Sequence, residues 1–206
     1  MEPPACCPGN QGFPMRDVDV VILPATHPDD PTYGFTPTQV AAHRQARLHA
    51  VRFPEVVWYN RAVRDQAMAQ IRALGLPSCV LVGFSKSGLG AWNIARQMAD
   101  QVQGAIIFDA PLASDDWRRW GDEFYQSDAA WQEDLPLHQI RRDPSVWPAH
   151  ASLVLISGTS FHAEMTRFSE ELTQRGTAHQ FLPRPDMPHH WDAGWLAEGL
   201  TALEGA

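Results

Sequence analysis

The sequence predicts a doubly wound α/β fold, with a mostly parallel sheet of about six strands and helices on both faces. Short apolar runs such as Val18–Leu23 and Cys79–Val82 alternate with stretches of helical period. Runs that are continuously apolar belong to strands buried on both faces, as parallel sheets require. With 206 residues, of which 44% are hydrophobic, the chain is long enough to bury a substantial core.

The expected strands, in chain order, are Val18–Leu23, Val56–Tyr59, Cys79–Val82, Ala105–Phe108, Leu153–Ile156 and His179–Leu182. A capping box with proline at the first helical position, Thr36–Gln39, predicts a helix that ends near Ala50. Asn60 caps the next predicted helix, and Gly75 and Pro77 end it. The later helices are expected near residues 88–101, 161–172 and 191–203.

Two segments depart from the alternation of strands and helices. Residues 1–16 are rich in proline and read as a loose tail before a domain at 17–206. Residues 112–150 are expected to form a small helical, lid-like insertion above the sheet. Its four tryptophans, at positions 117, 120, 131 and 147, fit a roof over an apolar pocket and simple core packing equally well.

Charge and cysteine usage exclude several classes of function. The net charge of −8 argues against nucleic acid and anionic membrane surfaces as partners. No apolar run approaches the length of a membrane span. The three cysteines, Cys6, Cys7 and Cys79, form neither a disulfide framework nor a zinc site, so we expect a reduced, cytoplasmic setting. The runs His27–Asp30 and His189-His190 have no recognised ligand spacing, and the serine turn has no nucleotide-binding pattern, so we expect no metal and no cofactor.

A serine at a strand-to-helix junction is the feature on which the functional prediction depends. Gly83-Phe84-Ser85-Lys86-Ser87-Gly88 follows an apolar strand and opens a helical run. A tight turn there holds a serine hydroxyl out of the sheet as a nucleophile, and it needs small residues two positions away. Ser87 stands where the G-x-S-x-G pattern has glycine, and it is still small.

A hydroxyl becomes nucleophilic when a histidine, oriented by a carboxylate, removes its proton. In an open α/β sheet these groups must come from loops at the carboxyl ends of strands. The histidines at such ends are His27, His162, His189 and His190. The last two follow the final strand.

The serine turn, the late histidine before Trp191 and the parallel sheet together resemble the α/β-hydrolase fold, in particular its small esterase and cutinase-like members. The resemblance covers about residues 18–203 and implies the chain order serine, acid, histidine. It favours His189 as the base over His190.

The same resemblance leaves the acid open. Most members carry it after the penultimate strand, where this chain offers Glu164, at the start of a helix. Some lipases of the fold carry it one strand earlier, and Asp109, in the turn Asp109-Ala110-Pro111, matches theirs. We therefore favour Asp109, with Glu164 second and Asp186 a remote third.

The oxyanion hole needs two backbone or side-chain donors. The backbone N–H of Lys86 is one candidate, and Ala25 or Thr26, after the first strand, supplies the other. The prediction is a serine hydrolase that cleaves a small-molecule carboxylic ester or thioester through an acyl-enzyme. The alternative is a hydrolase-fold protein that binds a ligand without turnover.

Overall fold

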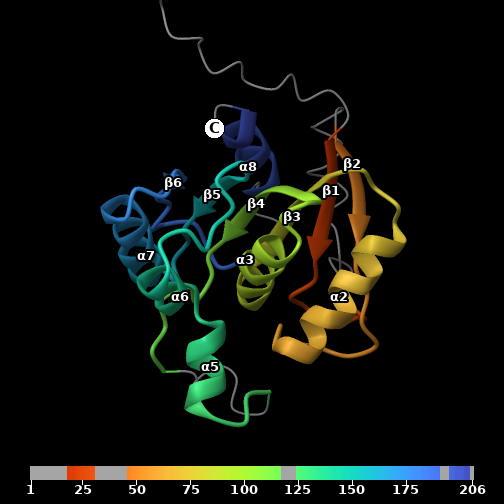
Figure 1. The fold of residues 1–206 in the computed structure, drawn as a ribbon, viewed down its shortest axis with the longest axis horizontal. Helices are drawn as coiled ribbons and strands as arrows, with labels where there is room; N and C mark the ends of the chain where they lie inside the picture. Colours follow the sequence, from red (N-terminus) through yellow and green to blue (C-terminus); the bar gives the residue numbers. More distant parts are fainter. Residues whose placement is uncertain (1–17, 31–45, 117–123, 191–194, 205–206) are drawn as a thin grey trace, which may run out of the picture.

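The structure, a computed structural model, describes residues 18–30, 46–116, 124–190 and 195–204. Its sheet has six strands in the order β2-β1-β3-β4-β5-β6, and every neighbouring pair is parallel. The strands are β1 (Val18–Leu23), β2 (Ala46–Ala50), β3 (Cys79–Phe84), β4 (Val102–Phe108), β5 (Ser152–Ile156) and β6 (Gln180–Leu182). The predicted fold class is confirmed (Figure 1).

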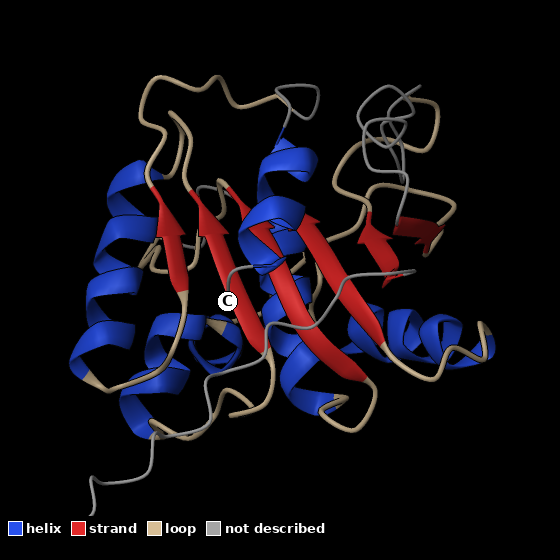
Figure 2. Ribbon diagram, turned by 90° about the horizontal axis from the view of Figure 1, so that it is seen from above, coloured by secondary structure: helices blue, strands red, loops and turns tan. Residues whose placement is uncertain are grey.

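Helices lie along both faces of the sheet (Figure 2). They are α2 (Arg61–Ala73), α3 (Lys86–Gln97), α5 (Asp128–Asp134), α6 (Pro136–Arg142), α7 (His162–Gln174) and α8 (Trp195–Glu204). One core cluster joins α2, α3, α6 and α7 to one face of the sheet. A second cluster packs Trp195 and Leu200 of α8 against the other face. Asn60 caps α2 through its side chain, as predicted.

The prediction for the second strand was wrong. Ala46–Ala50, expected as the end of a helix, forms β2 and pairs with β1, while residues 31–45 lie outside the described part of the chain. Alanine, arginine and leucine favour helices, but tertiary contacts override that preference. Arg47 and His49 both bond the buried carboxylate of Asp19 on β1, and these bonds fix the pairing.

The residues expected as the second strand form none. Val56–Tyr59 lies in the connection between β2 and α2, and its apolar character comes from packing instead. Trp58 and Tyr59 are buried, and the Tyr59 hydroxyl donates to the carbonyl of Pro24 at 3.0 Å. The aromatic side chains therefore tie this connection to the loop that follows β1.

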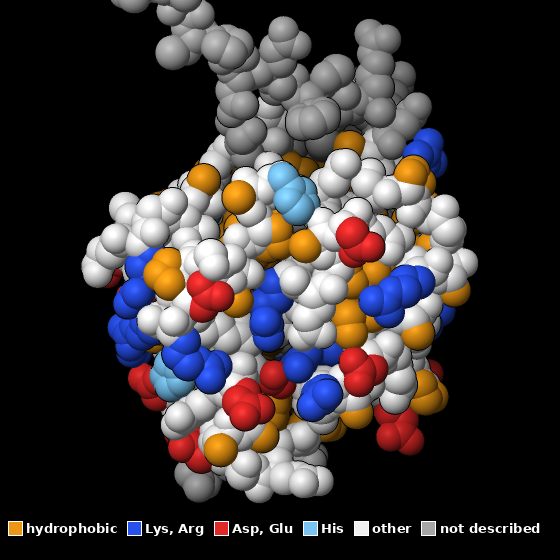
Figure 3. Space-filling model, in the orientation of Figure 1, with side chains coloured by type: hydrophobic (Ala, Val, Ile, Leu, Met, Phe, Trp, Pro, Cys, Tyr) orange, Lys and Arg blue, Asp and Glu red, His pale blue; other side chains and the backbone are white. Residues whose placement is uncertain are grey.

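The insertion carries α5 and α6 on the same side of the sheet as α3. Trp131 and Trp147 are both buried in the larger core cluster, and Trp147 stacks on Trp92 of α3. Trp117, Trp120 and the tail at 1–16 lie outside the described residues. The lid role of residues 112–150 stays a prediction. On this face of the molecule, acidic and basic side chains are interspersed (Figure 3).

Candidate active site

Ser85 occupies a strained turn between β3 and α3. Its φ is 54°, a value that residues with a side chain rarely adopt, and the strain is held by the strand before it and the helix after it. The helix begins at Lys86, two residues earlier than the sequence predicted. A Cβ on Gly83 would lie 2.4 Å from the backbone oxygen of Ser87, so only glycine fits at that position. The turn is the tight strand-to-helix junction that the sequence predicted.

Ser87 does more than fill the place of a glycine. It is fully buried, and its hydroxyl accepts from the N–H of Phe84 at 2.8 Å and donates to the carbonyl of Phe84 at 2.9 Å. The close approach of helix to sheet falls instead on Gly88, where a Cβ would lie 2.5 Å from that of Ala110. The two hydrogen bonds of Ser87 therefore fasten the turn around Ser85.

Asp109 follows β4 and is fully buried. One carboxylate oxygen accepts from the N–H groups of Gly158 and Phe161, at 2.8 Å each. The other accepts from the N–H of Ser160 at 3.2 Å. Burial by itself raises the pKa of Asp109, but the bonds from His189 and from the three backbone groups outweigh it and hold the pKa below its usual value. The group is therefore a buried carboxylate that stays ionised.

His189, in the loop after β6, is paired with that carboxylate. Its Nδ1 lies 2.6 Å from Oδ2 of Asp109. Its ring lies against that of Phe84, with centroids 4.6 Å apart, and edge-on to Phe161. Phe84 is the residue before Ser85, so the imidazole lies beside the serine turn. Among the described residues no hydrogen bond joins the hydroxyl of Ser85 to this imidazole, and such bonds are often long before substrate binds.

The loop after β1 lies level with Ser85. Leu23 pairs with Gly83 in the parallel register, so Ala25 and Ser85 both stand two residues beyond that pair. Ala25 and Thr26 are half-buried, and Tyr59 holds the carbonyl of the preceding Pro24. This loop therefore lies at the correct edge of the sheet to supply a donor beside the N–H of Lys86.

The other acids and histidines that the sequence offered as candidates are not part of the Asp109–His189 pair. Glu164, on the first turn of α7, is half-buried, and His189 pairs with Asp109 instead. His162 bonds the hydroxyl of Ser157 at 2.8 Å. His27, exposed, accepts from the N–H of Asp29. Two further candidates, Asp186 and His190, are exposed on the loop before α8.

Sequence reasoning missed the groups that hold the acid. It searched the loop after β5 for a carboxylate, whereas that loop donates three backbone N–H groups to the carboxylate of the preceding strand. The glycine at position 158 is the sequence signal for this close approach of the loop to the carboxylate, because a Cβ there would lie 2.7 Å from Oδ2 of Asp109. The ring of Phe84 beside the histidine was also missed.

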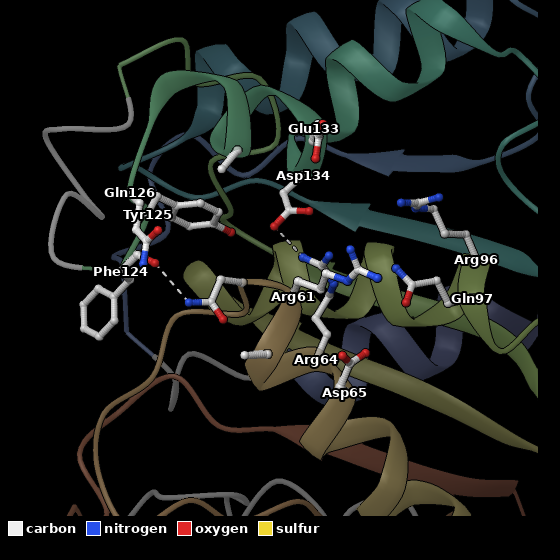
Figure 4. Close-up of a pocket in the computed structure, with 13 residues that line it drawn as sticks. Arg61, Arg64, Asp65, Arg96, Gln97, Phe124, Tyr125, Gln126, Glu133 and Asp134 are labelled. Atoms are coloured by element: carbon white, nitrogen blue, oxygen red, sulfur yellow. Dashed lines mark hydrogen bonds and ion pairs between the residues drawn. The ribbon is translucent and has the colours of Figure 1, made fainter.

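A separate pocket of about 560 Å³ opens between α2, α3 and α5. Figure 4 shows Arg61 and Arg64 together beside Asp134, with Arg96 on the wall formed by α3. Neither Ser85 nor His189 lines it. In the part of the chain that the structure describes, no cluster of acidic, histidine or cysteine side chains could hold a metal ion, and no helix is long and apolar enough to cross a membrane.

The six-stranded parallel sheet, the serine turn after β3 and the Asp109–His189 pair after later strands define the α/β-hydrolase fold. The sequence matches no family model and no curated protein. Its similarity to solved structures is extensive: 372 chains match. At the low identities found, this similarity shows the fold.

Three of these solved structures illustrate how much of each chain the similarity covers. A fluorophosphonate-binding serine hydrolase of Staphylococcus aureus is similar with a TM-score of 0.64 and 14% identity, over 95% of this chain and 87% of that one. A probable hydrolytic enzyme of Pseudomonas aeruginosa gives 0.57 and 16%, over 94% and 85%. A post-proline cleaving enzyme of Rickettsia typhi gives 0.65 and 12%, over 94% of this chain, which spans only 34% of that one.

Proposed function

We propose that the protein is a serine hydrolase that cleaves a small-molecule carboxylic ester or thioester through an acyl-enzyme intermediate. The observation that carries the proposal is the buried, ionised Asp109 bonded to His189 beside a serine at φ 54°. Burial of a carboxylate is costly, and here it is combined with backbone strain at Ser85. A strained serine beside a histidine–carboxylate pair is the arrangement that serine catalysis uses.

In this mechanism the hydroxyl of Ser85 attacks the carbonyl carbon of the ester. Nε2 of His189 accepts the hydroxyl proton and then donates it to the departing alcohol or thiol. Water next attacks the acyl-enzyme, with the same nitrogen acting as the base, and releases the acid. Asp109 fixes the proton on Nδ1 and stabilises the imidazolium that forms.

The negative charge that develops on the carbonyl oxygen needs donors already in place. The N–H of Lys86, at the first position of α3, is one, and it adds the partial positive charge of a helix N-terminus. The N–H of Ala25 or Thr26 is the second. Loss of one such donor typically costs 10²–10³ in rate, roughly 3–4 kcal/mol.

Labelling with a fluorophosphonate probe tests the proposal directly. The wild type is expected to be labelled, and Ser85→Ala is expected to lose the label while keeping its circular dichroism spectrum. A folded wild type that takes no label and hydrolyses no p-nitrophenyl ester would instead indicate the non-catalytic binding protein.

The choice of histidine is tested separately. We expect His189→Ala to lower kcat/KM for p-nitrophenyl acetate by about 10³ or more, and His190→Ala, on an exposed position of the same loop, to have little effect. If His190→Ala lowered kcat/KM by this factor and His189→Ala had little effect, the base would be His190.

A further inference from the structure

Lys86 is the only lysine in the sequence, although lysine and arginine together number 16. The other 15 of these 16 residues are arginines. The single exception stands directly after Ser85, at the first position of α3. An ammonium differs from a guanidinium in being a compact charge on a flexible stem, which suits a point contact with one anionic group.

The helix geometry directs this side chain toward the reacting serine. Side chains on a helix tilt toward its N-terminus, which for α3 is the Ser85 end. Adjacent Cα atoms are 3.8 Å apart, and a lysine side chain spans about 6 Å, so the ammonium lies within about 10 Å of the Cα of Ser85. A substrate bound at Ser85 lies within reach of that charge.

The residues on the same face of α3 show which elements lie next to Lys86. Residues four and seven positions along from Lys86 are Gly90 and Asn93. Gly90 packs against the ring of Tyr59, and Asn93 donates to the carbonyl of Asp134. The stripe that begins at Lys86 is therefore covered by the connection before α2 and by α5. Because Tyr59 also bonds Pro24, Lys86 starts this stripe next to the loop proposed for the oxyanion hole.

The ammonium of Lys86 is half-buried, and within residues 18–30, 46–116, 124–190 and 195–204 it has no ionic partner. No carboxylate in the described part of the chain forms an ion pair with it, and burial alone lowers the pKa of Lys86 to about 8. The group is still mostly protonated at pH 7. A partly desolvated cation without a counterion is costly, so a bound anion is the partner that would stabilise it.

We propose that Lys86 recognises an anionic group on the substrate, so that the enzyme prefers esters whose acyl chain ends in a carboxylate. The inference rests on the proposed function and names the substrate class of the same site. The ammonium acts on binding and orientation, while bond making stays with Ser85 and His189. Since burial weakens screening, the ion pair favours the charged ester by about tenfold or more over a neutral ester of equal length.

Paired substrates test this proposal. Monomethyl adipate and methyl hexanoate have the same chain length and differ in the terminal carboxylate, and acid release at pH 7 measures both. We expect the ratio of their kcat/KM values to fall about tenfold or more in Lys86→Met and to recover partly in Lys86→Arg. Arg72→Met, which removes an exposed cation from the last turn of α2, should keep the wild-type ratio. A ratio that Lys86→Met leaves unchanged overturns the proposal and leaves the hydrolase intact.

A binding measurement separates this proposal from the proposed function. Reductive methylation with ¹³C-formaldehyde labels only the N-terminal amine and Lys86, and the Lys86→Arg spectrum assigns the two signals. In Ser85→Ala, adipate is expected to shift the Lys86 signal and raise its pKa, whereas hexanamide should not. If no ester is hydrolysed, the hydrolase proposal fails, and the adipate titration alone decides the anion site: an unmoved signal refutes it.

Discussion

Replacement of Asp109 by asparagine tests both the chemistry and the architecture of the site. The carboxylate accepts four hydrogen bonds, two on each oxygen. An amide keeps one oxygen, so its nitrogen must face one pair of donors. At the first oxygen those donors are the backbone groups of Gly158 and Phe161, which cannot change. At the second oxygen the donors are the backbone N–H of Ser160 and the ring of His189, and an imidazole can move its proton to the other ring nitrogen.

The amide nitrogen is therefore expected to take the second position and donate to Nδ1 of His189. The imidazole proton then moves to Nε2, where it blocks proton transfer from Ser85. A tautomer error of this kind costs about 10³–10⁴ in kcat. The charge-assisted bond from Ser160 is also lost, and the one from His189 is replaced by a neutral bond. At about 1.5–3 kcal/mol for each charge-assisted bond, offset in part by the new bond and by easier burial of a neutral group, we expect a stability loss of about 2–4 kcal/mol.

Steady-state kinetics on p-nitrophenyl acetate and urea denaturation measure the two effects. Glu164→Gln is the matched control, because Glu164 is a half-buried carboxylate in the first turn of α7, where its charge contributes only about 0.3–1 kcal/mol. It should lower kcat less than threefold. A full loss of activity in Glu164→Gln with activity kept in Asp109→Asn would refute the reasoning.

The pH dependence gives a further check on the same pair of proteins. The pKa of Asp109 is lower in the folded chain than its usual 3.8. Its contribution to stability is therefore present above that value and is lost as pH falls through the folded pKa. The stability difference between wild type and Asp109→Asn should narrow in acid.

Three other predictions concern stability. Ser87→Gly, which makes the turn a standard G-x-S-x-G, should lower the free energy of unfolding by about 2 kcal/mol in urea denaturation, because two buried hydrogen bonds are lost; an unchanged midpoint would contradict it. Asp19→Asn should lower Tm at pH 7 and much less at pH 2, because the bonds from Arg47 and His49, despite burial, lower the pKa of Asp19 to about 2. Its contribution to stability is therefore largely lost as pH falls through that value. Lys86→Met should raise Tm at pH 7, and this gain should fade between pH 8 and 10.5. The reason is that the buried cation destabilises the folded chain fully below its folded pKa of about 8, and no longer does so above its unfolded pKa of 10.5. Equal melting curves at pH 7 would show the ammonium to be fully solvated.

The sequence by itself determined the fold class and the place of the tight serine turn. Continuous apolar runs specify strands buried on both faces, and that pattern is local. The turn at Ser85 was readable for the same reason, since glycine at 83 and a small residue at 87 are demanded by contacts between residues four positions apart. Even the departure from glycine at Ser87 left the prediction intact.

Tertiary structure decided the rest. β2 lies where the sequence favours a helix, because pairing with β1 and the bonds of Arg47 and His49 to Asp19 outweigh a weak local preference. The pairing of Asp109 with His189, which the sequence left open against Glu164, joins residues 80 positions apart. It depends on a loop after β5 whose N–H groups converge on one carboxylate. Every residue except proline has a backbone N–H group, so the sequence does not show which of these groups converge on Asp109. Only the folded structure shows it.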